Sequence, residues 1–244
     1  MIKFIAGVHG VGKSTYLCEN SSNEKVYSCS ELIKRIKSEN VRDNKKVSDI
    51  EKNQMILKEA IVKFISEESY ILDGHFTLID DNGLVADIPF DTYSSLMINE
   101  VNILIASPEV IYQRLISRDT FSTLNVTKIR EMQDREIRIG FEYSEKLNIP
   151  VYVLQVVDDL WIKSKIHSLK VDEKYFTLTL NGEKPFEIRN NEREFQENDL
   201  VILNEIDKSR QYTGRYLVRK IGALVDDFPP LVKIGYVVFS LVSI

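Results

Sequence analysis

An eight-residue loop near the start of the chain constrains the fold more than any other feature. Residues Gly7 to Ser14 read G-V-H-G-V-G-K-S and match the pattern G-x-x-x-x-G-K-[S/T] at every fixed position. The apolar run 2–6 precedes the loop and a helical pattern begins near Lys13, which is the strand–loop–helix context that the pattern requires. Because such loops fold around phosphate groups, the sequence predicts a nucleotide-binding domain here.

Each residue type in the loop suits that chemistry. The glycines allow the backbone to curl so that N–H groups point inward at phosphate oxygens. Lys13 is expected to reach the β- and γ-phosphates of ATP, and Ser14 to supply a hydroxyl ligand to Mg²⁺. His9 is expected to be a variable loop position and not a base. The predicted ATP contacts are Gly7, His9, Gly10, Val11, Gly12, Lys13, Ser14 and Thr15.

A second acidic ligand is expected at Asp73. The run Tyr70-Ile71-Leu72-Asp73 is an apolar strand pattern that ends in an acid. In a parallel sheet the carboxyl end of that strand lies beside the loop, so Asp73 is predicted to hold Mg²⁺ directly or through water. The alternative is that Asp73 ends the strand in a turn with Gly74. His75 and Phe76 then either line an acceptor pocket or complete the turn.

The first two-thirds of the chain alternate strand and helix patterns. This alternation predicts a parallel sheet with helices on both faces, that is, an α/β P-loop domain over residues 1–160. An Asn-Gly turn at residues 80–83 joins the runs 76–79 and 84–86 into an expected hairpin. The expected strands are 2–6, 25–28, 70–73, 101–106 and 151–155, and the expected helices are 13–20, 30–39, 49–66, 109–118 and 126–147.

From about residue 166 the pattern becomes mainly β. A short helix is expected over 172–180, where Asn181-Gly182 stops it. Strand-like runs follow at 186–189, 200–204, 215–225 and 233–242. Residues 161–244 are therefore predicted to form a second domain, a small mainly-β barrel.

Composition excludes several other classes. The chain has 244 residues and a formal net charge of −5, which disfavours tight non-specific DNA binding. Its two cysteines and three scattered histidines give no disulfide framework and no zinc spacing. The longest apolar stretch, 234–244, is short for a bilayer span and residues 1–6 look like a strand and not a signal peptide, so a cytoplasmic location without a membrane partner is expected. Nothing indicates an oligomeric state.

Two P-loop classes are disfavoured. A GTPase needs N-K-x-D, whereas the only Asn-Lys pair continues as Asn44-Lys45-Lys46-Val47. An AAA+ motor needs a longer core followed by a helical lid domain. Residues 28–35 read S-C-S-E-L-I-K-R, and with the loop and Asp73 they make residues 1–157 resemble the adenylate-kinase-like group of nucleoside and nucleotide kinases.

That resemblance implies ATP and Mg²⁺ as cofactors and assigns acceptor contacts. Glu31 falls at the group's acidic position and Lys34 or Arg35 at its basic position, although Ser30 replaces the usual glycine. The alternative is that Ser28 and Glu31 only form a helix capping box.

Arginines further along the chain are candidates for phosphate clamping. Arg114 and Arg118 lie four residues apart on one helix face, and residues 108–119 resemble the helix that leads into the group's lid, here 119–125. Their implied role is to stabilise charge on the transferring phosphoryl group. Arg130, Arg135 and Arg138 are further candidates. A solvated, charged helix face is the alternative in both cases.

The C-terminal part carries a series of motifs in order: H-S-L-K at 167–170, G-E-K-P-F-E-I-R at 182–189, Y-T-G-R at 212–215 and G-Y-V-V at 235–238. Together they resemble the ASCH family, a PUA-like β-barrel associated with RNA or modified-nucleoside binding. The family's acetylcytidine hydrolases have a Thr where Glu187 stands, so that activity is not expected. The alternative is a charge-paired strand surface. The predicted base or RNA pocket comprises Lys184, Glu187, Arg189, Asn190 and Arg193.

The sequence thus predicts a Mg·ATP-dependent phosphotransferase that acts on a nucleoside, a nucleotide or an RNA end, with a barrel that binds base or RNA. The second hypothesis is an ATP-binding sensor with little turnover, whose barrel binds RNA or a protein partner. The predicted catalytic residues are Lys13, Glu31, Asp73, Arg114 and Arg118.

Overall fold

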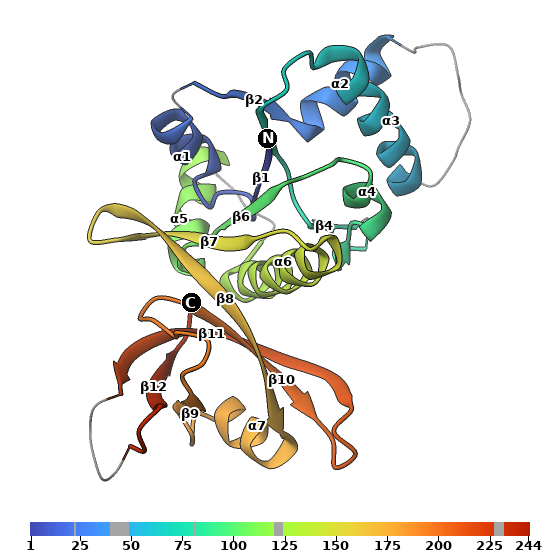
Figure 1. Cartoon of the computed structure of the whole chain (residues 1–244). Coiled ribbons are helices and arrows are strands. Elements are labelled where there is room, and N and C mark those ends of the chain that lie inside the picture. The colour runs from blue at the N-terminus through green and yellow to red at the C-terminus, as the bar shows by residue number, and fades with distance from the viewer. Residues whose placement is uncertain (22, 40–48, 81, 120–123, 227–231) are drawn as a thin grey trace. The chain divides into compact units, whose positions relative to one another are not determined.

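The computed structural model describes the chain except residues 22, 40–48, 81, 120–123 and 227–231 (Figure 1). It divides into two compact units, Met1–Val151 and Tyr152–Ile244. This division falls earlier in the chain than the expected domain boundary after residue 160.

The first unit is built on a parallel sheet. Strand β1 (Ile2–Ala6) pairs in parallel with β3 (Tyr70–Asp73) on one side and β6 (Glu100–Leu104) on the other, and β2 (Lys25–Ser28) pairs in parallel with β3. Apart from half-buried Lys3, the residues of β1 are buried and apolar, as expected for a strand covered on both faces. The predicted parallel α/β arrangement of this unit is confirmed.

Helices connect these strands. Asn125 caps the longest helix by accepting a hydrogen bond from the Lys128 amide at 2.8 Å, and Asn148 ends it with a φ of 54°. The five expected helices form, and α4 is an additional short helix. The helices are α1 (Lys13–Asn20), α2 (Cys29–Glu39), α3 (Asp49–Phe64), α4 (Phe90–Ser94), α5 (Pro108–Asp119) and α6 (Val126–Leu147) (Figure 1).

A hairpin follows β3 directly, as the Asn-Gly turn predicts. Strands β4 (Thr77–Ile79) and β5 (Val85–Asp87) pair antiparallel. The Asp80 side chain accepts hydrogen bonds from the backbone amides of Asn82 and Leu84 at 2.9 and 2.8 Å, and Gly83 adopts a φ of 76°. The hairpin fixes the chain immediately after Asp73.

The second unit is a mainly antiparallel sheet with one helix. Its strand order is β7-β8-β10-β11-β12-β9, and only the β8–β10 pair is parallel. The elements are β7 (Val151–Val157), β8 (Leu160–Asp172), α7 (Glu173–Leu180), β9 (Phe186–Asn190), β10 (Leu200–Ile206), β11 (Tyr212–Val225) and β12 (Tyr236–Val242).

The prediction of a closed barrel is wrong. Within the second unit the order runs from β7 to β9, and no pairing between these two strands closes it among the described residues. Strand β7 pairs with β8 only as far as Lys165. Beyond that point, two β8 carbonyls accept hydrogen bonds from arginine side chains: Lys170 O from Arg189 at 3.2 Å and Ser168 O from Arg193 at 2.8 Å. Side chains thus occupy an edge that a closed barrel would pair through backbone.

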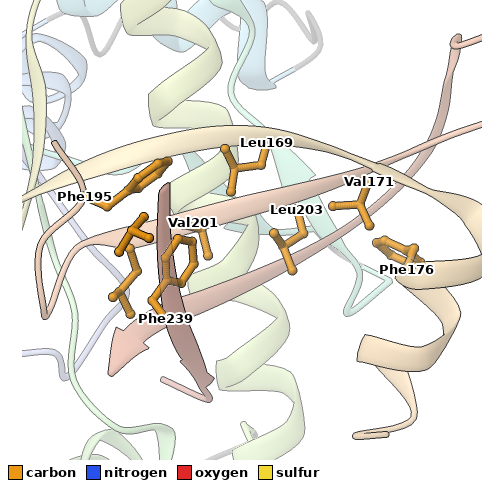
Figure 2. Packing of buried hydrophobic residues seen from close by; sticks show 9 residues of the cluster. Leu169, Val171, Phe176, Phe195, Val201, Leu203 and Phe239 are labelled. Atoms are coloured by element: carbon orange, nitrogen blue, oxygen red, sulfur yellow. The ribbon is translucent and has the colours of Figure 1, made fainter. Parts of the chain in front are cut away.

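The hydrophobic core of the second unit gathers side chains from four strands, a helix and a loop. Figure 2 shows Phe195 and Phe239 at one end of this cluster and Val171 and Phe176 at the other. Its members are Leu169, Val171, Phe176, Phe195, Val201, Leu203, Ile221, Val237 and Phe239.

No helix among the described residues is both long and apolar enough to span a lipid bilayer.

Candidate nucleotide-binding site

The loop between β1 and α1 depends on its glycines. Gly7, Gly10 and Gly12 have φ angles of 142°, 82° and 110°, a region that side chains disfavour. A Cβ on Gly7 would lie 2.7 Å from the Leu104 carbonyl oxygen, and one on Gly10 would lie 2.9 Å from Leu115 Cγ. The loop therefore has both the conformation and the close packing that the sequence motif implies.

Lys13 opens α1 and extends its side chain over the loop. Its ammonium donates a hydrogen bond to the Gly7 carbonyl, and Nζ lies 3.4 Å from His75 Nε2 and 3.9 Å from Asp73 Oδ1. Burial lowers the pKa of Lys13, while the negative charges of Asp73 and Glu136 act in the opposite direction. The ammonium is thus weakly paired and close to where phosphate groups would enter the loop.

Asp73 carries a polar atom without a partner. Its Oδ1 is buried and accepts no hydrogen bond from the described residues. Burial raises the pKa of this carboxyl, the charge of Lys13 lowers it, and the charge of Glu31 raises it further. A buried carboxylate oxygen without a donor favours a cation, and a hard oxygen ligand suits Mg²⁺. The site therefore fits the metal predicted from the sequence.

Protein groups alone do not enclose a metal here. Among the described residues, no group of three or more His, Cys, Asp or Glu side chains is placed to hold an ion. Magnesium bound through one or two protein oxygens and substrate phosphates needs no such group. Ser14 lines the same pocket as Asp73, so both predicted metal ligands face one space.

Two histidines lie together at the loop. The rings of His9 and His75 have centroids 4.5 Å apart. Burial lowers the pKa of His75 well below the usual range, and the nearby positive charges of Lys13 and His9 lower it further. The pKa of His9 is lowered by desolvation, then by Lys13 and Arg118. The site therefore favours neutral imidazoles beside the ammonium.

A pocket of about 690 Å³ extends from the loop across the first unit. Its lining includes the loop, Asp73 and His75. The lining also includes apolar side chains and Thr92, whose buried hydroxyl has no hydrogen-bond partner in the described part of the chain. The apolar wall comprises Phe4, Ile33, Leu57, Leu78, Ile88, Tyr93 and Leu96.

The predicted acceptor segment lies beside this pocket. Ser28, Ser30 and Lys34 line it, together with Lys37. The Arg35 guanidinium instead lies 3.8 Å from the centroid of the Phe64 ring, which makes Lys34 the better candidate for the basic position. Glu31 is exposed and contributes its charge near Asp73. Cys29 also lines the pocket, and burial raises the pKa of its thiol to about 12.

The five candidate arginines separate into different environments. Arg118 lines the pocket. Arg114 donates to the Val11 carbonyl at 2.7 Å and so supports the loop backbone. Residues 120–123 of the predicted lid lie outside the described residues. The arginines of α6 pair with acidic side chains: Arg130 with Glu109, Arg135 with Asp87 and Arg138 with Glu142.

Sequence reasoning missed two polar residues on the buried face of α6. Glu136 is 1% exposed and accepts hydrogen bonds from the amides of Gly7, Phe76 and Thr77 at 3.2, 2.8 and 2.8 Å, and from the Thr77 hydroxyl at 2.7 Å. Gln133 bonds both backbone groups of Ala106. Their three-residue spacing within an apolar helix face was the available signal.

The predicted base or RNA pocket is internally paired. The buried Glu187 carboxylate forms ion pairs with Lys184 at 2.5 Å and with Arg189 at 3.0 Å. Arg189 and Arg193 also bond the β8 carbonyls, whereas Asn190 is exposed. These contacts match the charge-paired alternative, and base or RNA binding stays a prediction.

Two family models match the chain. Residues 6–133 match the family described as AAA domain, and residues 166–241 match a domain of unknown function, DUF3850. The first match contains the loop and Asp73 and ends within α6. The sequence disfavours an AAA+ motor, and the matched family carries the AAA name. Membership of the adenylate-kinase-like group of kinases therefore stays a prediction. The second match leaves the ASCH resemblance a prediction.

One individual protein and one solved structure are similar to parts of the chain. An uncharacterized 12.9 kDa protein in the GpA 3′ region of Escherichia phage P2 is 36% identical over 63 residues, which are 26% of this chain and 57% of that protein. The chain thus spans little more than half of that relative. The crystal structure of a gluconokinase from Sinorhizobium meliloti 1021 is similar over 64% of this chain and 82% of its own, with 13% identity and a TM-score of 0.37, which is too low to support an inference.

Proposed function

Since the chain belongs to the AAA domain family through residues 6–133, we propose that it binds Mg·ATP at the loop 7–14 and transfers a phosphoryl group to an acceptor. One observation carries the proposal: the weakly paired ammonium of Lys13 and a buried oxygen of Asp73 that accepts no hydrogen bond face the same pocket beside the loop. The acceptor is a nucleoside, a nucleotide or an RNA end, and the activity is cytoplasmic.

Each residue then has a defined task. The loop amides and Lys13 hold the phosphates of ATP, and Ser14 with Asp73 holds Mg²⁺. When bound, the metal would neutralise negative charge on the phosphates. Arg118 supplies positive charge from the end of α5, whereas Arg114 keeps the loop in shape through its bond to Val11.

The apolar part of the pocket lining is the proposed acceptor side. Its aliphatic and aromatic wall suits a flat, weakly polar group such as a nucleobase, and the Thr92 hydroxyl offers a hydrogen bond that no described protein group uses. Lys34 and Lys37 on α2 supply positive charge for an anionic part of the acceptor. Cys29 remains a neutral wall residue at physiological pH because its thiol pKa is about 12.

A transfer screen tests the proposal. Labelled ATP is incubated with nucleosides, nucleotides and 5′-hydroxyl RNA in the presence of Mg²⁺. A stoichiometric phosphorylated product supports the phosphotransferase. ATP binding with only slow hydrolysis across all acceptors would support the sensor hypothesis instead.

For the second unit we propose weak binding of a nucleobase or short RNA. Exposed aromatic rings on neighbouring strands support it: the Lys184 ammonium lies 5.0 Å from the Phe186 ring, and the Lys233 ammonium lies 5.7 Å from the Tyr236 ring. Such rings can stack on bases while lysines face phosphates. NMR titration of the full chain with ribonucleotides and a short RNA should shift the signals of residues 182–193. Unchanged signals at these residues would contradict the assignment.

A further inference from the structure

The carboxylate of Glu136 joins two segments that are far apart in the sequence. Its Oε1 accepts the amide of Gly7, the first loop residue, and the amide of Phe76, which lies shortly after Asp73. Its Oε2 accepts the amide and the hydroxyl of Thr77. One side chain from α6 thus ties the start of the phosphate loop to the end of the strand that carries Asp73.

The set of partners specifies the protonation state of this group. All four hydrogen bonds are donated to Glu136, and each oxygen receives two. Three of the four donors are backbone amides, which cannot accept a hydrogen bond, and only the Thr77 hydroxyl could accept one from a protonated carboxyl, so the ionised form fits this set best. Burial raises the pKa of the carboxyl above its usual range, although the hydrogen bonds from residues 76 and 77 and the charge of Lys13 act in the opposite direction.

The same charge acts on Lys13. Glu136 is a buried negative charge that favours the protonated ammonium of Lys13 against the effect of burial. Gly7 is shared between the two, because its amide donates to Glu136 and its carbonyl accepts from Lys13. Glu136 therefore holds in place Gly7, whose carbonyl accepts the hydrogen bond from Lys13.

We propose that Glu136 is a positioning residue of the ATP site: its carboxylate fixes the loop at Gly7 against the segment after Asp73. The effect on ATP rests on the proposed function, whereas the hold on the two segments does not. Glu136 faces backbone and a hydroxyl, so it does not itself touch a substrate.

The test compares Glu136→Gln with Glu145→Gln. Both changes remove one negative charge from α6, but Glu145 is exposed and outside the site. Glutamine keeps the shape of Glu136 and turns one acceptor oxygen into a donor that faces donors. We expect calorimetry below the melting temperature to show an ATP affinity lowered by at least about tenfold in E136Q and little changed in E145Q. A merely structural role would lower the melting temperature but leave the affinity of the folded protein unchanged.

Two further measurements keep the test decisive. Thr77→Val removes only the hydroxyl bond and should weaken ATP binding by a smaller factor, roughly two- to fivefold, if E136Q fails to fold. Amide hydrogen exchange at Gly7, Phe76 and Thr77 should accelerate in E136Q, or in T77V at residue 77, and not in E145Q. Unchanged affinity together with unchanged exchange would overturn the positioning role. A wild-type chain that binds no ATP would overturn the proposed function instead, and the exchange comparison would still decide the role of Glu136.

Discussion

Lys13 is the residue on which nucleotide binding depends most directly. Its ammonium donates a hydrogen bond to the Gly7 carbonyl. Because Nζ lies 3.9 Å from Asp73 Oδ1, the ion pair between them is weak and little of the fold relies on it. We predict that Lys13→Ala lowers ATP affinity by roughly 100-fold in calorimetry, because a charge-assisted contact with phosphate is lost, while the melting temperature changes little. Lys128→Ala, on the surface of α6, is the matched control. An ATP affinity in K13A equal to that of the control would contradict the loop assignment.

Asp73 should matter for the metal more than for the nucleotide. Its partnerless oxygen is the protein group best placed to bind Mg²⁺. We predict that Asp73→Asn leaves binding of ATP in EDTA within about twofold of wild type, and weakens binding of Mg·ATP by roughly tenfold, because the amide lacks the charge that the cation requires. Titrations with and without Mg²⁺ measure the two values. An equal loss in both conditions would make Asp73 a turn residue.

The two cysteines should differ in reactivity. Burial raises the pKa of Cys29 to about 12, so almost no thiolate forms at pH 8, whereas Cys18 is exposed. Since the thiolate is the nucleophile, iodoacetamide at pH 8 should label Cys18 much faster than Cys29, and Cys18→Ser should remove the fast phase. The same pKa shift predicts that folding stability falls as pH rises above about 9, where the unfolded thiol ionises first. Rapid labelling of Cys29 in folded protein would contradict the raised pKa of its thiol.

For helices and strands, the sequence predicts those elements whose apolar pattern or turn residues lie within one short segment. The buried parallel strands β1 and β3 are apolar except for Lys3 and the terminal Asp73, and the glycines after β1 specify the loop. Strand β8 was missed between residues 160 and 172 because its burial changes phase: Ser164 and Ile166 are buried, and then His167, Leu169 and Val171. Polar residues at buried positions hide the alternation. Buried His167 is satisfied by Asp199, 32 residues away, which no local rule predicts.

The functional site also combines residues that local sequence identifies with residues that only tertiary packing brings in. Lys13, Ser14 and Asp73 are recognisable because motif and strand end lie in short contiguous segments. Glu136 and Thr92 acquire their positions through tertiary packing of α6 and α4, so their sequence surroundings carry little information. The arginines show both cases, because helix spacing places Arg114 and Arg118 on one face but does not say which of them lines the pocket.

Helix α5 offers a contrast between these two arginines. We predict that Arg118→Ala lowers turnover by roughly 100-fold with little change in ATP affinity, since a cation facing the pocket is needed most while phosphoryl charge moves. Arg114→Ala should instead weaken ATP affinity and lower the melting temperature, because the Val11 carbonyl loses its donor. Steady-state kinetics and calorimetry on both variants separate the effects. Equal losses of turnover and affinity in R118A would indicate uniform ground-state binding.

At the scale of the whole molecule, the chain divides into the units Met1–Val151 and Tyr152–Ile244. The second unit buries its own cluster of nine apolar side chains, drawn from β8, α7, β10, β11, β12 and the loop that holds Phe195. Its sheet begins at β7, before the residues that match the DUF3850 model at 166–241. The structural unit and the sequence-defined domain therefore have different starting points.

Because the structural unit starts before the sequence-defined domain, fragments cut at the two points should differ in stability. We expect the fragment 152–244 to fold on its own with a cooperative thermal transition, and the fragment 166–244 to be much less stable. The shorter fragment loses β7 and the six residues of β8 that pair with it, from Leu160 to Lys165. It also loses the Gln155 amide, which donates to the Asn198 carbonyl at 2.7 Å, and the Lys165 amide, which donates to buried Asp199 at 2.8 Å. Leaving such buried acceptors without donors costs on the order of 1–3 kcal/mol each, a large share of the stability of a small domain. Circular dichroism melts of the two fragments measure this directly. Equal melting temperatures would show that β7 and the first half of β8 contribute nothing to the second unit.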